Sequence, residues 1–148
     1  MDLIKKLREE SGAPIIRVKK VLEEFDGDEK KALDLLKKEG FEKAAKREER
    51  VTGQGKIFSY IHHTGKVASM VEVLCETDFV AKNELFEALG KDLAIQIASV
   101  PTEDAKELMD MEFIKDPSQK ISDLVKSVIA KTGENVRVGK IVRLEIGK

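Results

Sequence analysis

The sequence contains few of the residues that carry covalent and catalytic chemistry. Its 148 residues include one cysteine, two histidines and no tryptophan. One cysteine cannot form an internal disulfide, and Cys75 lies in an apolar stretch, which favours a buried, inert thiol over a reactive one. The only histidine pair, His62-His63, is expected on a hairpin, where adjacent strand residues point to opposite faces and cannot readily share one metal ion.

Enzyme motifs are missing as well. The chain has no phosphate-binding glycine loop ending in Lys-Ser or Lys-Thr, no nucleophile elbow and no Cys-His arrangement. Glu76 and Asp78 are close in sequence, but one carboxylate pair at the end of a strand is weak support for acid–base chemistry. We therefore predict a protein that is not an enzyme and has no cofactor or metal site of its own.

Long apolar runs are also lacking. No stretch reaches the roughly 18 apolar residues that a membrane-spanning helix needs. Residues 1–6 do not have the apolar core of a signal peptide. These patterns predict a cytoplasmic protein that does not associate with membranes.

Net charge is close to zero, because 27 basic residues face 28 acidic ones. No overall field therefore attracts nucleic acid. The most basic segment, residues 43–50, interleaves its lysines and arginines with glutamates and has no aromatic residues for base stacking. We expect no direct nucleic-acid binding, and RNA binding through this segment is a minority hypothesis.

Residues 1–40 have apolar residues at helical spacing in three short segments, with breaks at Gly12-Ala13-Pro14 and at Gly27. The third segment is expected to close at Gly40. This pattern resembles a ubiquitin-associated (UBA) type three-helix module, and such modules usually bind a partner surface. Lys19 and Lys20 lie on the polar side of the second helix, where a merely solvated face is the alternative to a binding surface.

The rest of the chain predicts a charged connector, residues 41–55, and an α+β core domain, residues 56–148. Residues 41–50 of the connector could continue as a solvated helix, which Thr52-Gly53-Gln54-Gly55 would end. Strands are expected at 57–62, 67–75 and 138–146, forming an antiparallel three-stranded sheet with helices packed on one face.

Alternation along the strands assigns faces to their side chains. Val71, Val73 and Cys75 are expected to share one face of the second strand. In the last strand the apolar residues Val142, Leu144 and Ile146 alternate with Arg143 and Glu145.

Two helices are expected between the second and third strands of the core domain. The first covers residues 81–100 and is stopped by Pro101, and the second is expected to begin at Ser118, whose hydroxyl is a good helix cap.

One short stretch connects the most apolar strand to the longest helix. Thr77 and Asp78 are good residues for starting a helix, because their side-chain oxygens accept hydrogen bonds from free backbone N–H groups. Phe79 is then held at a strand-to-helix corner, where its ring can project from a rigid base. The alternative is that Phe79 only covers the core.

One block of this sequence is especially distinctive: Cys75-Glu76-Thr77-Asp78-Phe79-Val80-Ala81. Further blocks are Leu7-Arg8-Glu9, Ser11-Gly12-Ala13, Lys19-Lys20, Gly27-Asp28, Ala32, Ala44-Ala45-Lys46, residues 57–62, Gly65-Lys66-Val67, Val71-Glu72-Val73, Phe113-Ile114-Lys115-Asp116 and Gly133-Glu134-Asn135-Val136. Taken together and in this order, these blocks resemble the elongation factor Ts family.

The resemblance implies a nucleotide exchange factor that binds elongation factor Tu carrying GDP. It implies that Thr77, Asp78, Phe79 and Val80 contact the partner near its magnesium site, with Phe79 inserted as a wedge that promotes GDP release. It further implies that the N-terminal module docks on the same GTPase through Lys19, Lys20 and Lys46.

The sequence also departs from the family pattern. Residues 102–109 are far shorter than the family's middle region, so secondary contacts with elongation factor Tu are in doubt. Short members of the family are dimers, so a homodimer is implied as well, with the sheet edge or its uncovered face as candidate surfaces. The competing hypothesis is a non-catalytic interaction module that binds a partner through the helical bundle without accelerating nucleotide release.

Overall fold

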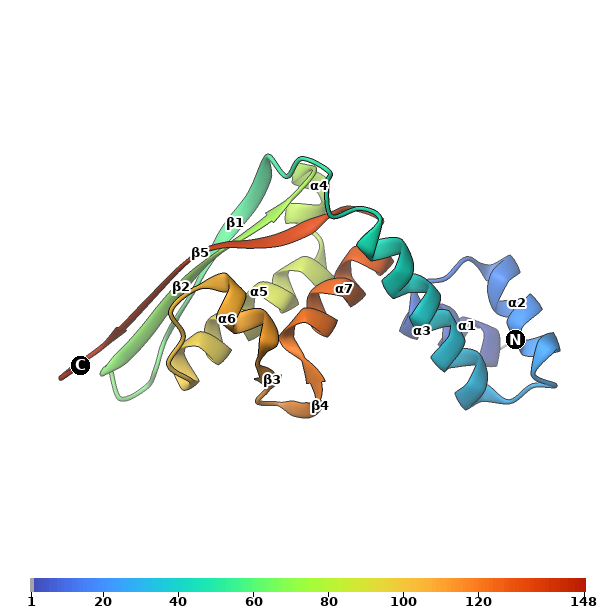
Figure 1. Cartoon of the computed structure of the whole chain (residues 1–148), viewed down its shortest axis with the longest axis horizontal. Helices are drawn as coiled ribbons and strands as arrows, with labels where there is room; N and C mark the ends of the chain where they lie inside the picture. Colours follow the sequence, from blue (N-terminus) through green and yellow to red (C-terminus); the bar gives the residue numbers. More distant parts are fainter. Residues whose placement is uncertain (1) are drawn as a thin grey trace.

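The structure, a computed structural model, describes residues 2–148. It begins with three helices, α1 (Asp2–Ser11), α2 (Ile15–Glu24) and α3 (Glu29–Ala45), which form a bundle at one end of the molecule (Figure 1). Asp28 starts α3, because its side chain accepts a hydrogen bond from the Lys31 backbone N–H at 3.1 Å. The core of this bundle is made by Leu7, Val18, Val21, Ala32 and Leu36.

The third helix does not close at Gly40, so that prediction is wrong. Helix α3 continues to Ala45. Gly40 lies where α3 crosses α7 (Ile121–Thr132), and a Cβ atom placed on it would lie 3.2 Å from the Cβ of Ala130. The glycine therefore allows a close helix crossing. The division of the chain into a module, a connector and a core domain stays a prediction.

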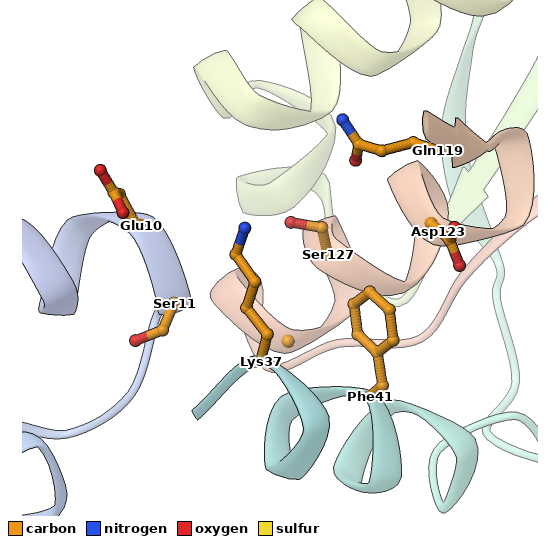
Figure 2. Close-up of a pocket in the computed structure, with 8 residues that line it drawn as sticks. Glu10, Ser11, Lys37, Phe41, Gln119, Asp123 and Ser127 are labelled. Carbon is orange, nitrogen blue, oxygen red and sulfur yellow. The ribbon is translucent and has the colours of Figure 1, made fainter. Parts of the chain in front are cut away.

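The junction between the bundle and α7 contains a small pocket of about 200 Å³. Figure 2 shows Lys37 and Phe41 of α3 facing Asp123 and Ser127 of α7 across it. The ammonium of Lys126 lies 5.9 Å from the centre of the Phe41 ring. The bundle thus packs directly against the core domain.

The core domain is built on one antiparallel sheet, as predicted. Its strands are β1 (Gln54–Ile61), β2 (Val67–Cys75) and β5 (Val136–Glu145), in the order β1-β2-β5. Helices α5 (Glu84–Ser99) and α7 pack against this sheet. The α+β fold class, with N-terminal helices followed by a helix-covered three-stranded sheet, is confirmed.

The helix predicted over residues 81–100 begins later, as α5 (Glu84–Ser99), and a separate short helix precedes it. This short helix, α4 (Asp78–Ala81), is a single turn, and Asn83 then starts α5 by accepting a hydrogen bond from the Leu85 backbone N–H at 2.8 Å. The break separates the Phe79 corner from the helix that covers the sheet.

The segment before α7 also differs from the prediction. It contains α6 (Ala105–Asp110) and a two-stranded hairpin, β3 (Glu112–Phe113) with β4 (Asp116–Lys120). Ser118 lies within β4, so its prediction as a helix cap is wrong. Helix α7 begins at Ile121, where the Asp123 carboxylate accepts a hydrogen bond from the Lys120 backbone N–H at 3.0 Å.

The faces of β2 agree with the predicted alternation, since Val71, Val73 and Cys75 are all buried. In β5 an irregularity changes the alternation. Val73 pairs with Val138, but Val71 pairs with Ile141, so β5 has one extra residue between these pairs. Such a bulge moves every later side chain to the opposite face.

The bulge leaves an apolar surface on the uncovered side of the sheet. We call it the open face, and it consists of Ile57, Ile61, Met70, Val142, Leu144 and Ile146, all between 47% and 71% exposed. Arg143 lies on the helix-covered side instead, where its guanidinium donates to the carbonyls of Ile97 and Ala98 at the end of α5. Among residues 2–148, no helix is long and apolar enough to cross a membrane.

Candidate partner-binding site

The Phe79 corner, residues 76–81, follows the end of the central strand. Thr77 is the N-cap of α4, and its hydroxyl oxygen accepts a hydrogen bond from the Val80 backbone N–H at 3.4 Å. Asp78 is exposed in the first turn, where a negative charge favours the helix N-terminus. Thr77 to Val80 therefore form one compact turn.

The first two side chains of α4 are exposed and the next two are buried. Val80 is 8% exposed and Ala81 is 5% exposed, and both belong to the core of the α+β domain. Phe79, between Asp78 and Val80, is 84% exposed. Phe79 therefore does not cover the core, and its whole ring is available to another molecule.

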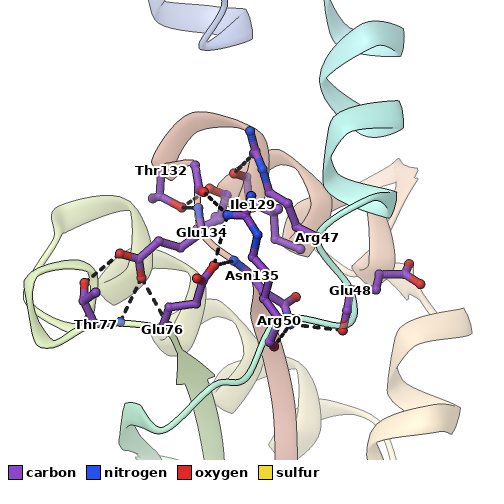
Figure 3. Close-up of polar contacts among 11 residues, drawn as sticks. Arg47, Glu48, Arg50, Glu76, Thr77, Ile129, Thr132, Glu134 and Asn135 are labelled. Carbon is purple, nitrogen blue, oxygen red and sulfur yellow. Dashed lines mark hydrogen bonds and ion pairs between the residues drawn. The ribbon is translucent and has the colours of Figure 1, made fainter.

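A carboxylate from a distant part of the chain binds this corner. Glu134 lies between α7 and β5, and one of its oxygens accepts hydrogen bonds from the backbone N–H groups of Glu76 at 3.1 Å and Thr77 at 3.0 Å. Its other oxygen accepts the Thr77 hydroxyl proton at 2.6 Å (Figure 3). Three donors of the corner thus converge on one side chain.

Asn135 extends this arrangement to the segment that follows α3. Its buried side chain donates to the backbone carbonyls of Glu48 at 3.2 Å and Arg50 at 2.8 Å. Its backbone N–H donates to the Glu76 carboxylate, which lies 3.6 Å from the Arg50 guanidinium. Figure 3 shows these side chains meeting between α3, α7 and the end of β2.

The predicted contact residues of the N-terminal module come from two helices. Lys19 and Lys20 are exposed on α2, and Lys46 is exposed at the end of α3. Ile16, which is 79% exposed, lies three and four residues before the two lysines and therefore shares their helix face. A bidentate ion pair between Arg17 and Glu39 joins α2 to α3.

Sequence reasoning singled out Thr77 to Val80 and named the uncovered face of the sheet as a candidate dimer surface. It gave no role to Glu134, Asn135 or Ile16. The only available signal for Glu134 and Asn135 was their place in the Gly133-Glu134-Asn135-Val136 block. Nothing in the sequence indicated that this block meets Glu76 and Thr77.

The Cys75 thiol contacts the corner, since it donates a hydrogen bond to the Thr77 carbonyl oxygen at 3.1 Å, but it is not a reactive group. Burial raises the pKa of the Cys75 thiol, and the nearby Glu134 carboxylate raises it further, so the thiol stays protonated. His62 and His63 follow β1 in a turn, and their ring centres lie 4.2 Å apart, so the expectation of opposite faces is wrong. Within the described residues 2–148, no cluster of three or more His, Cys, Asp or Glu side chains could hold a metal ion.

Comparisons with known proteins relate the chain to one family. The family model described as elongation factor TS matches residues 76–148. Elongation factor Ts of Leptospira biflexa is 38% identical to this chain, with 99% of the chain and 96% of the relative covered. Elongation factor Ts of Nitratidesulfovibrio vulgaris is 37% identical over the same shares.

A third relative, elongation factor Ts of Thermotoga neapolitana, is 36% identical, with 100% of the chain and 97% of the relative covered. These alignments run over 191 positions, whereas the chain has 148 residues, so at least 43 positions have no counterpart here. The expectation that the missing residues belong at 102–109 stays a prediction. The chain belongs to the elongation factor Ts family, whose members are nucleotide exchange factors in translation elongation.

Proposed function

We propose that this chain binds elongation factor Tu carrying GDP and promotes GDP release, with Phe79 acting as a wedge near the magnesium and nucleotide site of the GTPase. The observation that carries this proposal is the nearly complete exposure of Phe79 on a turn whose next two residues are buried. Membership of the elongation factor Ts family is the reason for choosing elongation factor Tu as the partner and GDP release as the reaction. On this proposal the protein works in the cytoplasm, transforms no substrate itself and needs no cofactor of its own.

Exchange requires an interaction that is stronger with the nucleotide-free GTPase than with the GDP form, and a Phe79 ring held in one position can make that distinction. A ligand shifts its partner between two states by no more than the difference of its affinities for them. Burial of a phenylalanine side chain contributes about 1.5–3 kcal/mol, which corresponds to roughly 10- to 150-fold in an equilibrium constant. Phe79 is therefore large enough to carry most of a useful coupling if its ring enters only the nucleotide-free form of the GTPase.

Coupling between the two binding sites must be reciprocal. If the chain weakens GDP binding to elongation factor Tu by some factor, GDP weakens binding of the chain by the same factor. The chain must therefore bind the nucleotide-free GTPase more tightly than the GDP form. This requirement separates an exchange factor from an interaction module, which binds both forms equally.

We assign the N-terminal bundle to docking on the same partner. Lys19 and Lys20 supply positive charge, and the exposed Ile16 between them and the start of α2 supplies an apolar contact. Lys46 lies at the C-terminal end of α3 and contributes a second positively charged contact. Charged contacts at a rim mainly set the association rate, whereas an apolar contact contributes more to affinity. No direct contact with nucleic acid is part of this proposal.

We also propose that the open face binds a second copy of this chain. Cross-strand pairs continue the apolar surface from Ile61 through Ala68 to Leu144, and from Met70 to Val142. Two such faces can pack on each other about 10 Å apart, as the two layers of a β-sandwich do. A two-fold axis brings the same patch of each copy together, so a single surface suffices for the contact.

The exchange proposal is tested by the release of a fluorescent GDP analogue from elongation factor Tu. We expect the parent chain to accelerate release and Phe79→Ala to lose most of the acceleration while still binding. Ile114→Ala is the matched control, because Ile114 is an exposed apolar residue outside the corner. Verified, saturating binding of the parent without acceleration would support the interaction-module hypothesis instead.

A further inference from the structure

We propose that Glu134 is the positioning residue of the Phe79 corner, holding Thr77 and the start of α4 so that the Phe79 ring points at the partner. This inference rests on the proposed exchange function. Glu134 is remote from Phe79 in sequence and acts through the backbone of Glu76 and Thr77.

The corner needs an external support. Helix α4 has four residues, and a single helical turn is not stable by itself, because its few hydrogen bonds do not offset the ordering of its backbone. The hydrogen bond that caps α4 is long, since the Thr77 hydroxyl oxygen lies 3.4 Å from the Val80 nitrogen. The Glu134 carboxylate accepts shorter hydrogen bonds from Glu76 and Thr77, at 2.6 to 3.1 Å.

The carboxylate also determines how the Thr77 hydroxyl is oriented. A hydroxyl has one proton to donate, and Thr77 directs it to Glu134 at 2.6 Å. A lone pair of the same oxygen is then left to accept from the Val80 N–H. Loss of Glu134 would therefore weaken the cap of α4 as well as the two backbone contacts.

Glu134 is itself held on both sides by the core domain. Helix α7 ends at Gly133 in the left-handed conformation, with φ of 79°, and β5 begins at Val136. The Asn135 backbone N–H donates back to the Glu76 carboxylate, so the two segments are joined by hydrogen bonds in both directions. This reciprocal contact transmits the rigidity of α7 and β5 to the corner beside Phe79.

Two substitutions distinguish the positioning role from a general effect on folding. Glu134→Ala removes all three hydrogen bonds. Glu134→Gln keeps an amide oxygen for the two backbone N–H groups and an NH2 group for the Thr77 oxygen, so it should retain most of the geometry. Glu112→Ala is the matched control, because Glu112 is exposed and its side chain has no hydrogen bond or ion pair among residues 2–148.

The first readout is the rate of GDP release from elongation factor Tu as a function of chain concentration. We expect Glu134→Ala to lower the maximal rate about tenfold or more, with a change of less than about threefold in the half-saturating concentration. Glu134→Gln and Glu112→Ala should stay within about threefold of the parent in both quantities. An unchanged maximal rate for Glu134→Ala overturns the proposal, as does a Glu134→Gln rate as low as that of Glu134→Ala.

The second readout is hydrogen exchange of the backbone amides at residues 76–80 in the free chain. Glu134→Ala should speed their exchange, and Glu134→Gln should not, while protection in β2 and α5 stays the same. Equal protection in parent and Glu134→Ala overturns the proposal whatever the kinetics show. If the parent does not accelerate GDP release, the proposed function fails, and this measurement still decides whether Glu134 orders the corner.

Discussion

Substitution of Gly90 by alanine should destabilise the core domain, although alanine has a higher helix propensity than glycine and Gly90 lies in helix α5. Gly90 lies inside α5, and glycine is about 1 kcal/mol less favourable than alanine in a helix interior. A Cβ atom placed on Gly90 would lie 2.2 Å from two atoms of the Phe58 ring on β1. Phe58 is buried and packs on Phe86, with 5.9 Å between the ring centres, so it has little room to move.

The two effects have opposite signs, and their sizes decide the outcome. Carbon atoms in contact normally lie about 3.5–4.0 Å apart, so the ring or the helix must shift by more than 1 Å. Overpacking of a core costs about 1–3 kcal/mol, and a displacement of this size belongs at the upper end. After the helix gain of about 1 kcal/mol is subtracted, we expect Gly90→Ala to lower the free energy of unfolding by about 1–2 kcal/mol.

Urea unfolding followed by far-ultraviolet circular dichroism measures this difference. Gly53→Ala is the control, because nothing lies within 4 Å of the added methyl group, and its effect should stay within about 0.5 kcal/mol. Adding Phe58→Leu should cost less in the Gly90→Ala background than in the parent, by at least about 0.5 kcal/mol. A Gly90→Ala chain more stable than the parent would refute the packing argument.

Two further predictions concern pH dependence and assembly. The bidentate hydrogen bond from Arg17 lowers the pKa of Glu39 from its ordinary value of 4.5. The ion pair therefore stabilises the bundle fully above about pH 4.5. This stabilisation is lost progressively as the pH falls through the lower pKa that Glu39 has in the folded chain. The difference in urea midpoint between parent and Glu39→Gln should therefore be largest near neutral pH and shrink below about pH 4.5; a difference that grows on acidification would contradict this sign. Leu144→Asp places a charge on the β5 side of the open face. Sedimentation equilibrium should therefore show a dimer for the parent and a monomer with unchanged circular dichroism for the variant. A monomeric parent at concentrations of about 100 µM would exclude the second copy as the occupant of the open face.

Local patterns predicted most of the architecture. The alternation of Val71, Val73 and Cys75 identified the buried face of the central strand, and the Thr77-Asp78 pair identified the start of a helix at the Phe79 corner. These features depend on neighbours within a few residues, where periodicity and capping rules apply.

Features that depend on distant residues were not predictable in this way. Val142, Leu144 and Ile146 alternate with Arg143 and Glu145 as a core-facing set would, yet the bulge in β5 puts Val142 and Leu144 on the uncovered face. In the sequence Gly40 has the features of a helix C-terminus. In the structure it lies inside α3, at the point where α3 crosses α7 close to Ala130. Glu134 meets Thr77 across 57 residues of sequence, so its contact with the corner appears only in three dimensions.

The measurement that tests the exchange mechanism most directly is the thermodynamic coupling between GDP and this chain on elongation factor Tu. The affinity of the GTPase for GDP is measured with and without the chain, and its affinity for the chain is measured with and without GDP. We predict that each ligand weakens the other by the same factor, and that Phe79→Ala brings this factor close to one while the affinity for the GDP form changes little. A coupling that Phe79→Ala leaves intact, or a parent that binds the GDP form and the nucleotide-free form equally, would contradict the wedge mechanism.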